Sequence, residues 1–181
     1  MKRKLATLAI VLPLVLTLDL ISKRWALVAL SDGNQMELFG GLVPLTLAFN
    51  RGAAFGISIG SDPRLLFIPI TIVALILLGT LFAKAETNDG LRLLSLALVI
   101  SGALGNLYDR VRWDVGVVDF LGPINLGFTD FPIFNVADMA ISCGAVLLAV
   151  SFWLEEREEA RRAALAPQAA TDSSEAAEPV S

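Results

Sequence analysis

Four long apolar runs constrain the fold of this chain more than any other feature of its sequence. They cover residues 5–30, 65–83, 91–108 and 135–154 of 181. A helix that crosses a membrane needs about 20 predominantly apolar residues. The chain is 55% hydrophobic and its mean hydropathy is +0.69, which is typical of a multi-pass membrane protein rather than of a soluble domain. We therefore predict a mainly α-helical membrane protein with four transmembrane helices.

The first run could also be a secretory signal peptide, because the basic residues Lys2 to Lys4 precede an uncharged stretch from Leu5 to Leu18. The helical pattern, however, continues through Asp19 and Lys23 and reaches the end of the run. Three further apolar runs follow it. We interpret the first run as a retained transmembrane span.

The basic residues that flank the spans predict the orientation, because Lys and Arg are enriched in short cytoplasmic segments. One side of a four-span arrangement receives Lys2, Arg3, Lys4, Lys84, Arg92, Arg157, Arg161 and Arg162. The other side receives Arg51, Arg64, Arg110 and Arg112. Both termini are therefore predicted to be cytoplasmic, and residues 31–64 and 109–134 to face outward.

Two segments outside the spans have patterns of their own. Leu45, Leu47 and Phe49 alternate with smaller or polar residues, which predicts a strand and a small sheet at the outer membrane surface. Residues 163–181 contain almost no large apolar side chains and cannot bury enough surface to fold. We predict a membrane domain over residues 1–162 and a disordered acidic cytoplasmic tail over residues 163–181.

The composition excludes several kinds of catalytic site. The chain has no histidine and one cysteine, so histidine-dependent triads, Cys/His dyads and His-ligated or multi-Cys zinc sites are impossible. We expect Cys143, inside the last apolar run, to be a small buried apolar side chain. The net charge of -4 arises mostly from the C-terminal region and gives no indication of nucleic-acid binding. We expect neither a metal nor a cofactor.

Asp119 and Asp138 are the strongest candidates for chemistry, since each borders strongly apolar sequence. A charge at a membrane boundary is costly unless it is paired, hydrated or used. The segment between them contains glycines and prolines that let it fold back. If the two carboxyl groups converge, one pKa rises and the pair holds a single proton, which suits activation of a water molecule. Separate structural caps or ion pairs are the alternative.

Further polar residues lie within the spans. Asp19 and Lys23 share one helix face, either as a structural ion pair or as the polar wall of a cavity. Gly102 and Gly105 are spaced for close helix packing, and the same face continues with polar residues. These polar residues are expected to point into the bundle rather than toward lipid: Asn106, Asp109 and Arg110 in the third span and Asn135 at the fourth.

Five blocks of sequence, in order, resemble the lipoprotein signal peptidase (signal peptidase II) family. They are Asp19-Leu20-Ile21-Ser22-Lys23, Asn50-Arg51-Gly52-Ala53-Ala54-Phe55-Gly56, Gly102-Ala103-Leu104-Gly105-Asn106-Leu107-Tyr108-Asp109-Arg110, Val117-Val118-Asp119-Phe120 and Phe134-Asn135-Val136-Ala137-Asp138. The resemblance covers about residues 5–154. Leu20 stands where many members of the family have glutamine.

The resemblance implies an aspartic endopeptidase of the bacterial inner membrane that removes signal peptides from diacylglyceryl-modified prolipoproteins, cleaving before the lipidated cysteine. It implies a four-helix bundle with a small periplasmic β-cradle and a mobile outer helix, and an active site near the periplasmic face. The family's catalytic aspartates fall on Asp119 and Asp138. Its supporting, substrate-binding residues fall on Asp19, Lys23, Asn50, Gly52, Asn106, Arg110, Asn135 and Ala137.

By the same resemblance, the partners are lipidated prolipoprotein signal peptides and membrane lipids, and globomycin-type cyclic peptides are expected inhibitors. We expect a monomer. Two other classes of protein fit parts of the pattern. A proton-coupled transporter would also place carboxylates inside a bundle, but paired repeats and interrupted midplane helices are absent from the sequence pattern. A purely structural protein would not need Asn50, Asn106 and Asn135 beside two acids.

Overall fold

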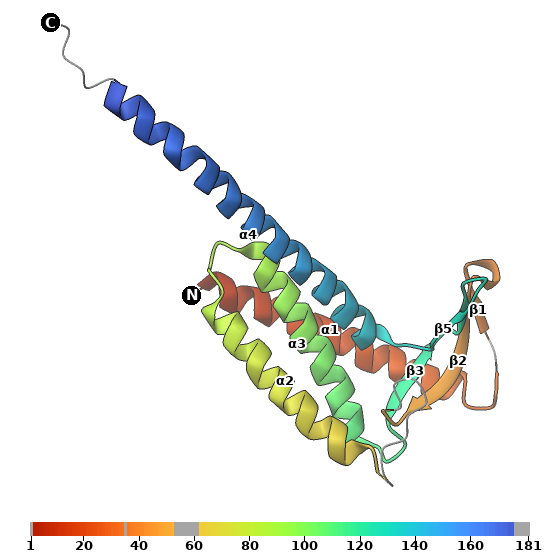
Figure 1. Ribbon diagram of the computed structural model, residues 1–181. Helices are drawn as coiled ribbons and strands as arrows, with labels where there is room; N and C mark the ends of the chain where they lie inside the picture. The colour runs from red at the N-terminus through yellow and green to blue at the C-terminus, as the bar shows by residue number, and fades with distance from the viewer. Residues whose placement is uncertain (1, 35, 53–61, 176–181) are drawn as a thin grey trace, which may run out of the picture.

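The computed structural model describes residues 2–34, 36–52 and 62–175, with side chains as far as Leu165. The described residues form four long helices and a small region of strands (Figure 1). The helices are α1 (Lys2–Ala29), α2 (Arg64–Lys84), α3 (Gly90–Arg112) and α4 (Val136–Glu175). Each is long and apolar enough to cross a membrane, which confirms the four predicted spans. Residues 53–56 of the second sequence block lie outside the described residues.

Helix α3 is the centre of the bundle, because it contacts α1, α2 and α4. Its contact with α4 depends on a missing side chain. A Cβ atom at Gly102 would overlap the carbonyl oxygen of Ala137 and approach the side chain of Ile141, both on α4. The close helix packing predicted from the glycine spacing is thus confirmed.

The strands form a layer at the end of the bundle away from the N-terminus (Figure 1). β1 (Met36–Leu38), β2 (Val43–Asn50) and β3 (Val117–Leu121) make an antiparallel sheet in the order β1-β2-β3, with the single 3-10 turn η1 (Phe39–Gly41) between the first two. β4 (Ile124–Asn125) pairs with β5 (Asp130–Phe131) as a separate hairpin. The predicted strand and small sheet are confirmed.

Two apolar clusters hold the bundle, one toward each end. Near the α2–α3 connection, Phe82 packs with Leu93 and Leu96. At the sheet end, Ala26 and Leu30 of α1 pack against two strand residues, Leu45 and Phe120. The second cluster fixes the sheet on α1, so strand β3 is held against the helices.

Helix α4 is longer than the sequence predicted. The fourth span was expected to end at Leu154, and the chain from residue 163 to be disordered, but the backbone is helical as far as Glu175. Alanine and glutamate favour helix, and Arg162 and Glu158 form an i,i+4 ion pair of 3.1 Å on its surface. The side chains of residues 152–165 are all exposed, and Arg92 of α3 contacts the start of this stretch through Phe152 and Glu155.

Candidate active site

Asp119 and Asp138 are brought together by a short backbone connection. Phe134, just before α4, accepts hydrogen bonds from the backbone of Phe120 and Leu121 in β3, at 3.1 and 2.9 Å. The N–H of Phe134 donates back to the carbonyl of Leu121 at 2.9 Å. This bridge places the end of β3 beside the start of α4. The segment between the aspartates thus folds back, as its glycines and prolines predicted.

Asn135 joins the two carboxyl groups directly. Its side-chain Nδ2 donates to Asp119 Oδ1 at 2.6 Å, and its backbone N–H donates to Asp138 Oδ2 at 3.1 Å. Its own Oδ1 accepts the backbone N–H of Asp138 at 2.9 Å. This reciprocal pair is a capping box, with Asn135 before the first turn of α4 and Asp138 within it. One amide therefore caps the helix and positions both acids.

Both carboxyl oxygens of Asp138 accept a hydrogen bond. One oxygen accepts from Asn106 Nδ2 at 2.7 Å, and the other accepts the Asn135 N–H. The group also lies in the first turn of α4, where the helix dipole favours negative charge. Asp138 is only partly buried, so a water molecule can approach it.

The Asp119 carboxyl group is more deeply buried than that of Asp138. It is 2% exposed, and burial raises its pKa from 3.8 to about 7. The negative charge of Asp138 adds to the increase, while hydrogen bonds from Asn135 and Asn50 and the charge of Lys23 oppose it. Asp119 therefore exchanges a proton near neutral pH. The two carboxyl groups thus differ in burial, with Asp119 enclosed and Asp138 partly open to water.

This increase in the pKa of Asp119 predicts a pH dependence of stability. The folded protein holds the proton more tightly than the unfolded chain, so the stabilisation is complete below about pH 4 and is lost as the pH rises to about 7. Between about pH 5 and pH 8, we expect wild type to lose about 3 kcal/mol more than Asp119→Asn. Thermal unfolding across this range measures the difference. Parallel curves for the two proteins would contradict the raised pKa.

Asn106 connects the aspartates to a buried group of charges. Its Oδ1 accepts from Lys23 Nζ and from Asn135 Nδ2, both at 3.1 Å, while its Nδ2 donates to Asp138. Two donors on one side and an acceptor on the other fix the orientation of the amide. The predicted inward orientation of Asn106 and Asn135 is confirmed, because both are buried and hydrogen-bonded to each other.

Lys23 is shared by two carboxylates. Its ammonium lies 2.8 Å from Asp19 Oδ2 and 2.9 Å from Asp109 Oδ2, and all three residues are at least 98% buried. Asp19 Oδ1 also accepts the backbone N–H of Ala137 at 2.9 Å, which ties α1 to the first turn of α4. The predicted Asp19–Lys23 pair is present, and Asp109 joins it as a third member.

Asp109 belongs to this network, although it was not among the predicted site residues. Its Oδ2 accepts both from Lys23 and from the backbone N–H of Val118, at 3.2 Å, next to Asp119. The available signal was its place on the polar face of the third span. The sequence predicted that Asp109 points into the bundle, but not that it meets Lys23 and the backbone of β3.

The remaining candidates lie at the edge of this network. Asn50, at the end of β2, accepts the backbone N–H of Gly52 at 2.8 Å and also hydrogen-bonds Asp119. Gly52 has φ +104°, and a Cβ there would overlap the Phe67 ring, so only glycine fits this turn. Arg110 Nη1 donates to the Asn106 carbonyl at 3.4 Å, and its guanidinium lies over Phe67, 5.6 Å from the ring centre.

A mainly apolar cavity of about 240 Å³ opens beside Asp138. Its lining comes from β5, from the segment between β5 and α4, and from one face of α4: Phe131, Phe134, Asp138, Met139, Ser142 and Cys143. Cys143 is exposed on this face, so the expectation that it is buried was wrong. A side chain that faces lipid is as apolar as one in the core, and the sequence pattern cannot separate the two. Among the described residues, no three His, Cys, Asp or Glu side chains are placed to hold a metal.

Together, the helices and the paired carboxyl groups define a multi-span membrane protein with a water-accessible acid beside a buried acid and an apolar cavity. Residues 11–154 match the family described as Signal peptidase (SPase) II. The chain belongs to this family of peptidases.

Individual relatives agree with that assignment. The chain is 38% identical over 153 residues to the lipoprotein signal peptidase of Clostridium tetani (strain Massachusetts / E88), covering 84% of this chain and 96% of the relative. It is 37% identical over 159 residues to the lipoprotein signal peptidase of Streptococcus pyogenes serotype M5 (strain Manfredo), covering 86% and 97%.

Two solved structures have the same fold. Both are described as bacterial membrane enzymes studied by the in meso method, one at 2.3 Å and one at 1.9 Å resolution. The first has a TM-score of 0.74 and 32% identity, covering 83% of this chain and 90% of that one. The second has a TM-score of 0.72 and 33% identity, covering 81% and 92%. The predicted fold class is confirmed.

Proposed function

We propose that this protein is an aspartic endopeptidase that removes the signal peptide from diacylglyceryl-modified prolipoproteins, cleaving before the lipidated cysteine. The observation that carries the proposal is the pair Asp119 and Asp138. Both carboxyl groups accept a hydrogen bond from Asn135, and one is buried while the other is partly exposed. Membership of the signal peptidase II family supports the reaction class. The apolar cavity beside Asp138 supports a lipophilic substrate.

In the proposed mechanism, the Asp138 carboxylate takes a proton from water, and the resulting hydroxide attacks the scissile carbonyl carbon. Protonated Asp119 donates its proton to the carbonyl oxygen, which avoids an unpaired negative charge in a buried site. Asp138 then gives its proton to the leaving amine as the C–N bond breaks. The hydroxyl proton of the intermediate returns to Asp119, so both acids regain their starting states.

The neighbouring polar groups support this chemistry by position. Asn106 and Asn135 donate hydrogen bonds to the Asp138 carboxylate. Lys23, paired with Asp19 and Asp109, donates to Asn106 and so fixes the position of its amide. We propose that Arg110 and Asn50 bind the backbone of the substrate, since the scissile bond of an apolar helix must be unwound and its freed polar groups satisfied. Arg110 Nε is buried with no hydrogen-bond partner among the described residues, so it can still donate.

The distribution of Lys and Arg supports a bacterial inner-membrane protein with both termini cytoplasmic and the aspartates near the periplasmic face. A diacylglyceryl group is anchored by its acyl chains, at about 0.8 kcal/mol for each buried methylene, which keeps the substrate cysteine at the interface. Cleavage at the level of the strands is consistent with that anchoring.

The direct test is a proteoliposome assay with the purified full-length chain. A prolipoprotein carrying diacylglycerol on its cysteine is expected to be cut, while the same substrate without the lipid is expected to remain intact. A pH-gradient assay on the same vesicles tests the proton-coupled transporter as the alternative. Proton flux without cleavage would reject the peptidase.

Cys143 allows a test of the cavity beside Asp138. It is the only cysteine in the chain and is exposed, so a maleimide labels one known position. We expect N-phenylmaleimide to reduce cleavage at least about tenfold, because even 1.4 kcal/mol of lost substrate binding has that effect. Cleavage by Cys143→Ser should be unaffected by the reagent. Full activity of completely labelled wild type would place the substrate elsewhere.

A further inference from the structure

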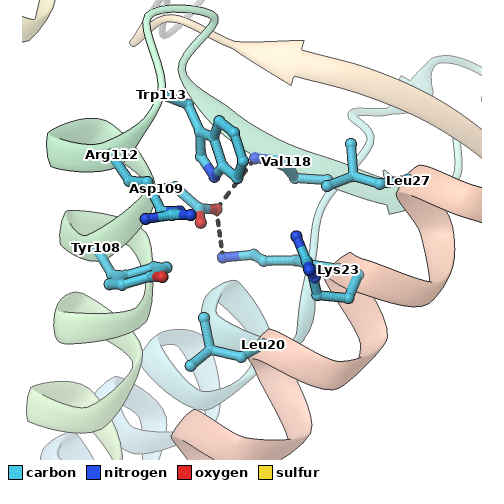
Figure 2. Close-up of a pocket in the computed structure, with 9 residues that line it drawn as sticks. Leu20, Lys23, Leu27, Tyr108, Asp109, Arg112, Trp113 and Val118 are labelled. Carbon is cyan, nitrogen blue, oxygen red and sulfur yellow. Dashed lines mark hydrogen bonds and ion pairs between the residues drawn. The ribbon is translucent and has the colours of Figure 1, made fainter.

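A second cavity, of about 260 Å³, lies between α1 and α3 near the sheet end of the bundle. Its lining contains none of Asp119, Asn135 and Asp138. Figure 2 shows Lys23 reaching from α1 and Asp109 from α3 toward each other at this cavity, with Tyr108 and Trp113 at its α3 side. The cavity is therefore separate from the apolar one beside Asp138.

The charges around this cavity favour an anion. Four charged residues line it: Lys23, Arg24, Asp109 and Arg112. Lys23 is already paired with Asp19 and Asp109, so the uncompensated positive charge comes from Arg24 and Arg112. The negative charge of Asp109 is already compensated, since it accepts from Lys23 and from the backbone N–H of Val118. Arg24 and Arg112 are both exposed, and neither forms a salt bridge within the described ranges.

The other lining residues indicate the level of the membrane interface. Tyr108 is half exposed, and Trp113 lies under the Arg112 guanidinium, 5.0 Å from it. Tyr and Trp are enriched where the bilayer meets water. Leu20 and Leu27 of α1 complete the lining with apolar surface. Arg112 is the last residue of α3, and α1 ends at Ala29, so the cavity lies near the ends of both helices.

We propose that this cavity binds the headgroup of an anionic phospholipid. Arg24 and Arg112 would hold the phosphate, because a guanidinium matches phosphate oxygens in geometry and charge. Tyr108 and Trp113 would donate to headgroup oxygens, and the acyl chains would lie along Leu20 and Leu27. Basic pockets between transmembrane helices bind lipid headgroups by this chemistry. The simpler alternative is that both arginines extend to the interface without a specific partner.

The test measures lipid binding to the delipidated full-length protein in detergent by native mass spectrometry. The probes are dioleoyl phosphatidylglycerol, dioleoyl phosphatidylcholine and inorganic phosphate. We expect phosphatidylglycerol to bind about tenfold or more tightly than phosphatidylcholine, and Arg24→Gln with Arg112→Gln to remove that preference, since each basic residue near an anionic lipid surface contributes comparably. Arg161→Gln with Arg162→Gln, on the exposed end of α4, removes the same charge and should leave the preference unchanged.

Several outcomes would overturn the proposal. One is equal binding of the two lipids by wild type. Another is a loss of the lipid preference in the control variant as large as in the Arg24→Gln, Arg112→Gln variant. A third is phosphate alone binding as tightly as phosphatidylglycerol, which would indicate a site for a small anion. If the double variant does not fold, the single variants Arg24→Gln and Arg112→Gln are each expected to weaken the preference severalfold. Asp138→Asn should bind phosphatidylglycerol like wild type, so this proposal can fail or succeed independently of the proposed peptidase activity.

Discussion

Asp119→Asn and Asp138→Asn are each expected to reduce cleavage of a lipidated prolipoprotein by about a hundredfold to ten-thousandfold, the range that general acid–base catalysis contributes. Asparagine keeps the shape of the side chain but can neither store the proton of Asp119 nor take one from water in place of Asp138. Initial rates in proteoliposomes, at saturating and at low substrate, measure the loss. We expect it in kcat, because neither substitution enlarges or fills the apolar cavity.

The two variants should differ in stability. Asp119→Asn removes a buried acid that is costly to ionise, so its unfolding temperature above about pH 7 should equal or exceed that of wild type. Asp138→Asn alters the capping box with Asn135 and should cost about 1 kcal/mol. Asp130→Asn, on the exposed strand β5, is the matched control and should change neither property. Substantial turnover by either site variant would reject the acid pair.

Lys23→Met is expected to give the largest loss of stability in the chain, about 3–5 kcal/mol, because it leaves two buried carboxylates without their cation. Unfolding temperature in detergent measures this effect. Changing Asp19 to Leu together with Lys23→Met should recover only part of the loss, since Asp109 is still buried and unpaired. Adding Asp109→Asn removes the last charge and should recover most of the remainder.

Activity measurements on the same variants show whether the triad positions Asn106 for catalysis or only stabilises the fold. If the triad positions Asn106 for Asp138, the neutral triple variant should be stable but slow, with kcat reduced and KM little changed. Addition of Asn106→Ala to this variant should then cost less than Asn106→Ala costs in wild type, because the two changes act on one network. A stable triple variant with wild-type kcat would show that the triad is only structural.

The sequence by itself determined the features that are encoded locally. Four apolar runs of membrane length predict four spans in any tertiary arrangement, and the alternation around Leu45 predicts strand β2. Asp119, Asp138, Asn106 and Asn135 could be identified as candidates because each is an acid or an amide next to apolar sequence. Burying such a group in a membrane protein is too costly without a partner or a use.

Only the tertiary structure decided which of these groups meet, and how. The backbone bridge between β3 and Phe134 brings both aspartates within hydrogen-bond distance of Asn135. The contact between α1 and α3 adds Asp109 to the Asp19–Lys23 pair. The different environments of the two acids also follow from this arrangement, since burial depends on neighbours distant in sequence.

The exposure of Cys143 shows the physical limit of the sequence pattern. Lipid tails are as apolar as a protein core, so hydropathy identifies a membrane span but does not indicate which of its faces packs against other helices. For a soluble helix, the polar face would provide that information. In this bundle, the rotation of each helix, and with it the lining of both cavities, is set by packing at positions such as Gly102 and by the buried polar contacts between helices.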